Sequence, residues 1–202
     1  MLFYIIFILV LFSSCLPLIF LYTKPIKIFE FYTSNKLLVL LLLSRFISDI
    51  LVFIFGKVYG NSMPVFYFSI LFEFIILVNI LDGIVPVKFK KISLIIGVLS
   101  FIADLSMTRD LFSDNLYSTI VTFCIIIGIT GKMIISNSIS SQMELFVNSI
   151  FLYYIIALTY TFFQKFNFTT DLIYDFAFYF FALATLLFNI SLTYHVCTVK
   201  QK

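Results

Sequence analysis

Three charged side chains lie inside hydrophobic stretches of the sequence, where charge is unfavourable. Arg45 and Asp49 belong to the stretch LLVLLLLSRFISDILVFIF, and Glu73 belongs to VFYFSILFEFIILVNIL. A charged side chain near the centre of a lipid bilayer costs about 2.5–3.5 kcal/mol on insertion scales, so such residues usually face the protein interior and are paired or functional. Carboxylates beside an arginine suit the binding of a ligand, an ion or a proton. The rest of the chain must hold these groups away from lipid.

The composition identifies lipid as the main solvent of the chain. Of 202 residues, 62% are hydrophobic and only 11% are charged, whereas a soluble domain usually carries about 25% charged residues. The net charge of +3 is small, and no dense basic block indicates a nucleic-acid partner. The single histidine excludes a His-rich metal site, and no cofactor is expected.

Seven hydrophobic segments are candidate membrane spans. Irregular backbone is not tolerated against lipid, and no segment alternates polar and apolar residues as a barrel strand does, so the spans are predicted to be helices. The sequence therefore predicts an all-α, polytopic transmembrane bundle that forms one domain over residues 1–202. The fourth span is the weakest, because Asp104 lies near its end. The predicted spans are 2–22, 37–55, 63–81, 92–107, 116–135, 145–163 and 171–196.

Lysine and arginine residues orient the predicted bundle, because cytoplasmic loops are enriched in them. The loops after the first, third and fifth spans and the C-terminal tail hold nine of these residues, and the opposite side holds three. The N-terminus is therefore expected outside and the C-terminus in the cytoplasm. The nine are Lys24, Lys27, Lys36, Lys88, Lys90, Lys91, Lys132, Lys200 and Lys202, and the three are Lys57, Arg109 and Lys165.

The charged residues are predicted to lie at similar depths in this bundle. With a helix rise of ~1.5 Å per residue, Asp49 lies about 18–20 Å from the cytoplasmic side and Glu73 about 13–14 Å below the outer surface. In a hydrocarbon core of ~30 Å these are nearly one level, in the outer half. Asp104 falls somewhat above it. Because short connections make the second, third and fourth spans neighbours, the hypothesis is one site containing Arg45, Asp49, Glu73 and Asp104.

The charge balance of this cluster leaves three interpretations open. One arginine faces two or three carboxylates, so either an acid is protonated or a cation is held there. In the first interpretation Arg45 and Asp49 form a buried pair that fixes helix packing, with Glu73 neutral. In the second the cluster binds a ligand, an ion or a proton. In the third the span boundaries shift and one charge reaches the lipid headgroups.

Several short motifs resemble a known family. Gly60-Asn61, Tyr67 and Phe72-Glu73-Phe74, followed by a basic loop and by Asn115-Leu116-Tyr117-Ser118, are similar to a family of uncharacterised bacterial inner-membrane proteins of about seven helices. Members are often encoded near sensor histidine kinases. The resemblance implies a sensory or accessory protein of the bacterial inner membrane, with a membrane signalling partner such as a histidine kinase. It also adds Asn61 to Glu73 as a candidate site residue.

Three functions follow as alternatives. The preferred one is a sensory or accessory protein without its own output domain, which binds a ligand, a proton or a partner through the cluster. The second is a small-solute transporter of the seven-helix type, although no internal repeat is evident. The third is an intramembrane lipid hydrolase that uses Asp49, Glu73 and Asp104 as acid and base. In being small, polytopic and carboxylate-bearing the chain resembles the lysoplasmalogenase type. An enzymatic role is disfavoured but left open.

Overall fold

The hydrophobic segments form seven helices in a computed structural model, which describes residues 2–23, 33–60, 62–108, 116–137, 139–166 and 171–198. Each predicted span is helical, so the all-helical prediction is confirmed. The helices extend beyond several predicted spans, because backbone hydrogen bonding continues where the apolar sequence ends. The helices are α1 (Leu2–Thr23), α2 (Thr33–Tyr59), α3 (Met63–Ile84), α4 (Lys90–Thr108), α5 (Leu116–Ile135), α6 (Ser141–Phe166) and α7 (Asp171–Thr198).

Five of these helices, namely α2, α3, α5, α6 and α7, are long and apolar enough to cross a membrane. The described part of α1 contains a shorter apolar stretch, Ile8–Phe20. Helix α4 begins with Lys90 and Lys91 and carries Asp104 near its end. Its outward side chains are nonetheless large and apolar, as Ile95, Leu99 and Ile102 are exposed. The described helices therefore present apolar surfaces that suit a lipid environment.

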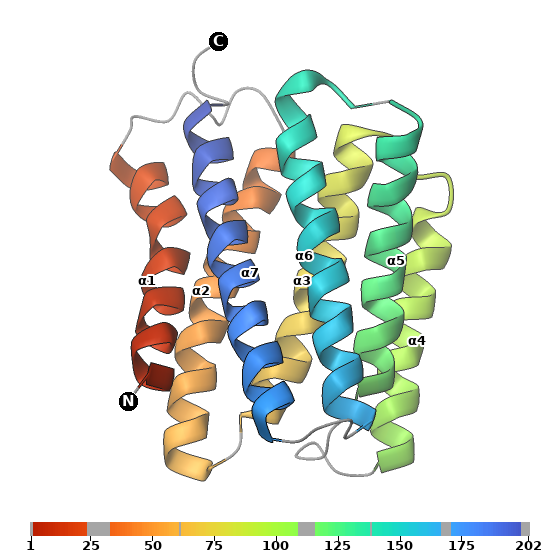
Figure 1. The fold of residues 1–202 in the computed structure, drawn as a ribbon. Helices are drawn as coiled ribbons and strands as arrows, with labels where there is room; N and C mark the ends of the chain where they lie inside the picture. Colours follow the sequence, from red (N-terminus) through yellow and green to blue (C-terminus); the bar gives the residue numbers. More distant parts are fainter. Residues whose placement is uncertain are drawn as a thin grey trace.

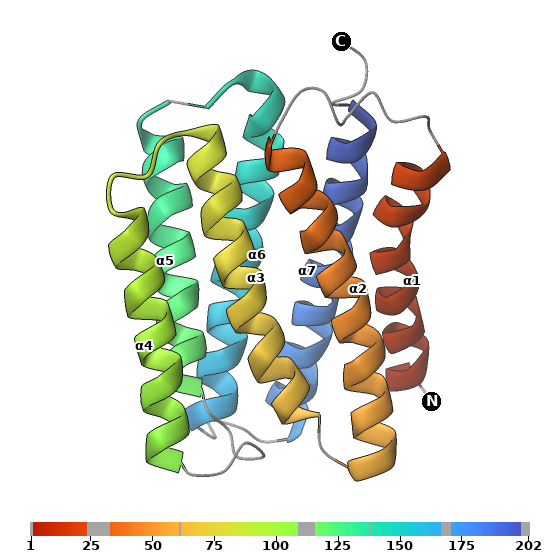
Figure 2. The same ribbon diagram turned by 180° about the vertical axis from the view of Figure 1, so that it is seen from behind.

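Six helices form a closed ring, and the seventh lies outside it. Around the ring α1 contacts α2, α2 contacts α3, α3 contacts α5, α5 contacts α6, α6 contacts α7, and α7 returns to α1. Helix α4 packs against α3 and α5 on the outer side (Figures 1 and 2). The short connection from α3 thus makes α4 a neighbour of α3, but α4 lies toward α5 rather than toward α2.

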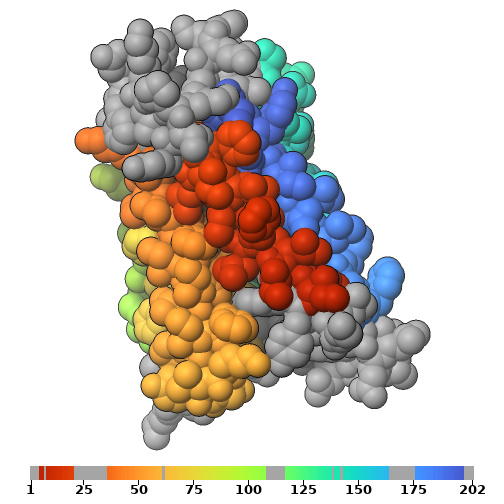
Figure 3. Space-filling view, turned by 90° about the vertical axis from the view of Figure 1, so that its left-hand side faces the viewer, coloured from red at the N-terminus to blue at the C-terminus, as the bar shows by residue number. Residues whose placement is uncertain are grey.

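Helix α1 closes the ring, because it packs against both α2 and α7. Figure 3 shows α1 lying obliquely across α2 and α7, and both contacts are extensive along the described part of α1. Its Ser13 hydroxyl accepts a hydrogen bond from Nδ2 of Asn189 on α7 at 3.0 Å. Both side chains are buried, so this bond links two apolar helices where water is excluded. Helix α1 thereby forms the side of the ring between α2 and α7.

Helix α3 is shared by the ring and by α4, and much of it is buried between them. On the α4 side the Phe74 ring occupies the space where a Cβ at Gly97 would lie. Nearby, the Tyr67 ring stacks on Phe101 of α4 and its hydroxyl donates to the Phe101 carbonyl at 3.0 Å. The lack of a side chain at Gly97 therefore allows α4 to approach α3 closely. The buried residues of α3 are Tyr67, Phe74, Ile76, Leu77, Val78, Ile80 and Leu81.

A tight turn joins α3 to α4 at the end of the bundle where α7 ends (Figure 1). One oxygen of the Asp82 carboxylate accepts a hydrogen bond from the backbone N–H of Val87 at 3.0 Å, and the other is 2.8 Å from Nζ of Lys90. Helix α1 begins at the opposite end. Because successive helices alternate in direction, Lys36, Lys88 and Lys132 are all near the end that contains this turn.

Candidate binding cavity

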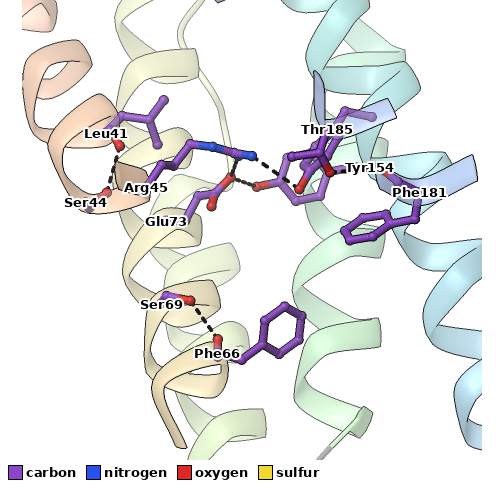
Figure 4. A network of polar contacts seen from close by, with 10 residues as sticks. Leu41, Ser44, Arg45, Phe66, Ser69, Glu73, Tyr154, Phe181 and Thr185 are labelled. Atoms are coloured by element: carbon purple, nitrogen blue, oxygen red, sulfur yellow. Dashed lines mark hydrogen bonds and ion pairs between the residues drawn. The ribbon is translucent and has the colours of Figure 1, made fainter. Parts of the chain in front are cut away.

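An ion pair between Arg45 and Glu73 connects α2 with α3. Nη1 of Arg45 is 2.5 Å from Oε1 of Glu73, and the same oxygen accepts a hydrogen bond from the Tyr154 hydroxyl of α6 at 2.7 Å. Figure 4 shows the Arg45 side chain extending past Glu73 toward α6. All three residues lie near the middle of their helices. Three helices of the ring thus meet at one carboxylate oxygen, at mid-length of the bundle.

Aromatic rings hold the Arg45 guanidinium on its other sides. Its Cζ lies 5.0 Å from the centre of the Tyr153 ring and 4.8 Å from that of Phe188. Nη2 also donates to the Tyr153 hydroxyl at 3.3 Å. The electron-rich faces of aromatic rings attract cations, so these contacts stabilise the charged guanidinium inside the bundle. The positive charge of Arg45 is therefore occupied by groups of the protein itself.

Asp49 lies one turn after Arg45 on α2, but Arg45 pairs with Glu73 instead. The ion pairs among the described residues are Arg45–Glu73 and Lys90–Asp82. The Ser14 hydroxyl of α1 lies close to the Asp49 carboxylate. That hydroxyl also lies 2.9 Å from the Leu11 carbonyl, and a serine hydroxyl has only one hydrogen to donate. Asp49 is thus a carboxylate within the ring that has no ion-pair partner in the described part of the chain.

Arg45, Asp49 and Glu73 all line one cavity inside the ring, with a volume of about 290 Å³. Ligand pockets start at about 300 Å³, so this cavity suits a small molecule. Every helix of the ring contributes to its wall. Besides the charged groups, the wall has the serine and threonine side chains Ser48, Ser69 and Thr185, and aromatic side chains that include Phe66, Phe178 and Phe181.

The cavity favours positive charge in a ligand. Counting one arginine against two carboxylates, its charged groups sum to a formal charge of −1 when all are ionised. Moving an unpaired carboxylate out of water is strongly unfavourable, so a bound cation or a proton stabilises this arrangement. The aromatic wall adds surfaces that attract an organic cation. The chemistry available here is binding, with Asp49 as the acceptor of positive charge.

Asp104 does not line this cavity, because α4 lies outside the ring. Its carboxylate is buried and accepts a hydrogen bond from the backbone N–H of Ser118 at 2.6 Å. Ser118 is in the first turn of α5, where backbone N–H groups have no partner within the helix. Asp104 therefore stabilises the start of α5, and the predicted cluster of four charged residues contains three.

The sequence did not identify every residue of the cavity. Asn61, a candidate by resemblance, lies outside the described residues. Tyr153 and Tyr154 are not among the predicted site residues, yet both hydroxyls bond to the charged pair. Ser14 and Thr185 gave no signal of their own in the sequence. Their only common feature with Arg45 and Glu73 is a polar group at a similar depth, and depth does not reveal which way a side chain points.

The described residues contain no group of three or more His, Cys, Asp or Glu side chains that could hold a metal ion. The fold and the cavity thus define an all-helical bundle with apolar outer surfaces and charged groups inside, compatible with an integral membrane protein. Comparison of the chain with protein-family models, with curated proteins and with solved structures gives no match.

Proposed function

We propose that this chain is an integral membrane protein with a sensory or accessory role, which binds a small positively charged ligand in the cavity of the helix ring. The observation that carries the proposal is the Asp49 carboxylate, which faces the cavity while Glu73 already pairs with Arg45. An ammonium group beside Asp49 would form a charge-assisted hydrogen bond, which is stronger than a neutral one. Phe66, Phe178 and Phe181 would contact the remainder of the ligand.

The pre-formed pair between Arg45 and Glu73 supports this proposal. Since Arg45 is held by a carboxylate, a hydroxyl and two rings, it adds little free positive charge to repel a cationic ligand. Glu73 keeps 17% of its side-chain surface accessible, so part of its carboxylate also faces the cavity. Two acidic groups on one wall thus favour a cation over an anion of the same size.

The membrane topology forms part of the proposal. The chain would cross a bacterial inner membrane seven times, with the N-terminus outside and the lysine-rich end in the cytoplasm. The alternation of the helices and the shared end of Lys36, Lys88 and Lys132 support it. A fluorescent protein fused to the C-terminus should fluoresce if that end is cytoplasmic. A C-terminal fusion active only in the periplasm would contradict the proposed topology.

A sensory role requires that the ligand alter a contact with another protein. We propose a membrane signalling partner, such as a histidine kinase, as that contact. Crosslinking in native membranes with and without the ligand would test it, with the Asp49→Asn variant as the control. Transport and lipid hydrolysis remain predictions from the sequence, and the continuous helices around the cavity give neither of them specific support.

Thermal unfolding of the purified chain in detergent tests the ligand class. Benzylammonium is a suitable probe, because it combines one positive charge with one ring. At concentrations well above its Kd it should raise the Tm of the wild type by about 3–8 °C. Asp49→Asn should abolish this rise. Glu144→Gln, which removes an exposed carboxylate at the start of α6, should leave it unchanged.

Two other results would count against the proposal. An equal rise of Tm in the Asp49→Asn variant would show that binding does not depend on this carboxylate. A wild type that is stabilised by acid but not by benzylammonium or sodium would indicate a proton site instead of a ligand site. Benzyl alcohol, which has the ring without the charge, serves as the matched probe and should have little effect.

A further inference from the structure

A second hollow, outside the ring, lies at the end of the bundle that contains the α3–α4 turn. It is formed between this turn and the C-terminal half of α5 and has a volume of about 300 Å³. Figure 2 shows the turn beside the end of α5. Gly128 is exposed in its wall, and nothing lies within 4 Å of where a Cβ would be. Gly128 therefore leaves an open groove along α5.

Two lysines of different elements line this hollow. Lys88 comes from the turn and Lys132 from α5. Both are exposed, and neither has an ion-pair partner among the described residues, whereas Lys90 of the same turn is paired with Asp82. Two positive charges that the protein does not neutralise therefore converge on one hollow, which favours an anion between them.

Apart from Ser93 and Ser136, the remainder of the hollow is apolar. Below Lys132 the groove runs past Gly128 to Ile125, seven residues or about 10 Å along the helix. A free anion would have no use for this apolar length. A phospholipid combines both features, because its phosphate is followed by glycerol and acyl chains. Basic pockets between helices at the membrane surface are known to take anionic headgroups.

We propose that this hollow binds an anionic phospholipid. Its phosphodiester lies between Lys88 and Lys132, and one acyl chain follows the groove along Gly128 toward Ile125. The proposal does not depend on the ligand of the inner cavity, since the two hollows share no lining residue. In the proposed topology the lipid comes from the cytoplasmic leaflet.

Native mass spectrometry of the purified chain can test both halves of the site, with phosphatidylglycerol and phosphatidylcholine added in turn. The wild type should prefer phosphatidylglycerol. The double variant Lys88→Gln/Lys132→Gln should reduce this preference roughly tenfold to thirtyfold, because each lysine near a membrane surface contributes about a fivefold gain in affinity for anionic lipid. Lys36→Gln, which removes an exposed lysine at the same end of the bundle, should leave the preference unchanged.

A second variant tests the groove without altering charge. Gly128→Leu fills the open space along α5 and should weaken the binding of both lipids severalfold. Gly56→Leu is the matched control, since Gly56 is also helical and open, and it should have no effect. An unchanged preference in the double lysine variant, or an equal loss in Lys36→Gln, would overturn the proposal. So would binding of inorganic phosphate or glycerol phosphate as tight as that of the lipid and insensitive to Gly128→Leu, which would indicate a free-phosphate site.

Discussion

Asp49 and Asp104 are both aspartates within hydrophobic helices, yet they have different surroundings. Asp104 is 3% exposed, and its carboxylate bonds to the backbone of α5. Asp49 faces a cavity, and the nearby Ser14 hydroxyl donates its hydrogen to the Leu11 carbonyl. The Asp104 carboxylate stabilises the start of α5, and the Asp49 carboxylate is available to a ligand. The difference shows that depth in the bundle does not decide the role of a buried charge, whereas the position of its helix inside or outside the ring does.

Removing the cation of the cavity should have the largest effect on stability. Arg45→Gln leaves two carboxylates facing each other without a positive charge, and breaking a buried pair in this way typically costs about 3–5 kcal/mol. Unfolding in mixed detergent micelles, followed by circular dichroism, measures the change. The double variant Arg45→Gln/Glu73→Gln should recover part of the loss. If Arg45→Gln lowered the free energy of unfolding no more than Lys57→Gln does, the pair of Arg45 with Glu73 would not be important for stability.

Removing the structural aspartate should have the next largest effect. Asp104→Ala leaves the buried N–H of Ser118 without this acceptor, which should lower the free energy of unfolding by about 2–3 kcal/mol. Asp104→Asn keeps an acceptor oxygen and should lose less. The same unfolding measurement applies. If Asp104→Ala instead changed the response to benzylammonium and left stability intact, the assignment of the two aspartates would be reversed.

The hydroxyl of Tyr154 should contribute less than either charged group. Tyr154→Phe keeps the ring and removes the donor to Glu73, so a loss of about 1.5 kcal/mol is expected for a hydrogen bond to a charged acceptor. Tyr179→Phe, on the half-buried part of α7, provides the control. Equal losses in the two variants would show that the bond to Glu73 contributes nothing specific.

Asp49→Asn should have the smallest effect of all. Because Asp49 has no ion-pair partner among the described residues, the neutral amide should change the free energy of unfolding by less than about 0.5 kcal/mol, or increase it. The comparison between the two aspartates therefore predicts a much smaller loss of stability for Asp49→Asn than for Asp104→Ala. A loss as large as that of Asp104→Ala would mean that Asp49 also serves the structure, and the cavity would lose its acceptor of positive charge.

Much of the fold follows from the sequence because lipid imposes simple rules. The segment 116–135 is helical with the predicted bounds, and the charged residues of α2 and α3 meet because helix rise fixes their depth. Rotation about the helix axis is not fixed in this way. Spacing along α2 suggested Arg45 and Asp49 as partners, but the faces of α2 and α3 that meet place Glu73 beside Arg45 instead.

The position of Asp104 was wrong for a related reason. The direction of its side chain depends on the packing of α4 against α5, which the sequence of α4 alone does not indicate. Gly97, which permits the close approach of α4 to α3, gave no pattern in the sequence. A contact between two helices depends on how both surfaces fit together. A single sequence indicates the residues of each surface but not which surfaces pack against each other.

Helix α3 carries Glu73 in the cavity and Asp82 in the turn to α4, and these two residues are nine positions apart. Nine residues turn an α-helix by about two and a half revolutions, so the two carboxylates point to opposite sides. Inserting one residue between them would rotate one end by about 100° relative to the other, and either the pair with Arg45 or the turn with Lys90 would be lost. The length of this segment is therefore a strict condition on any natural variation of the chain.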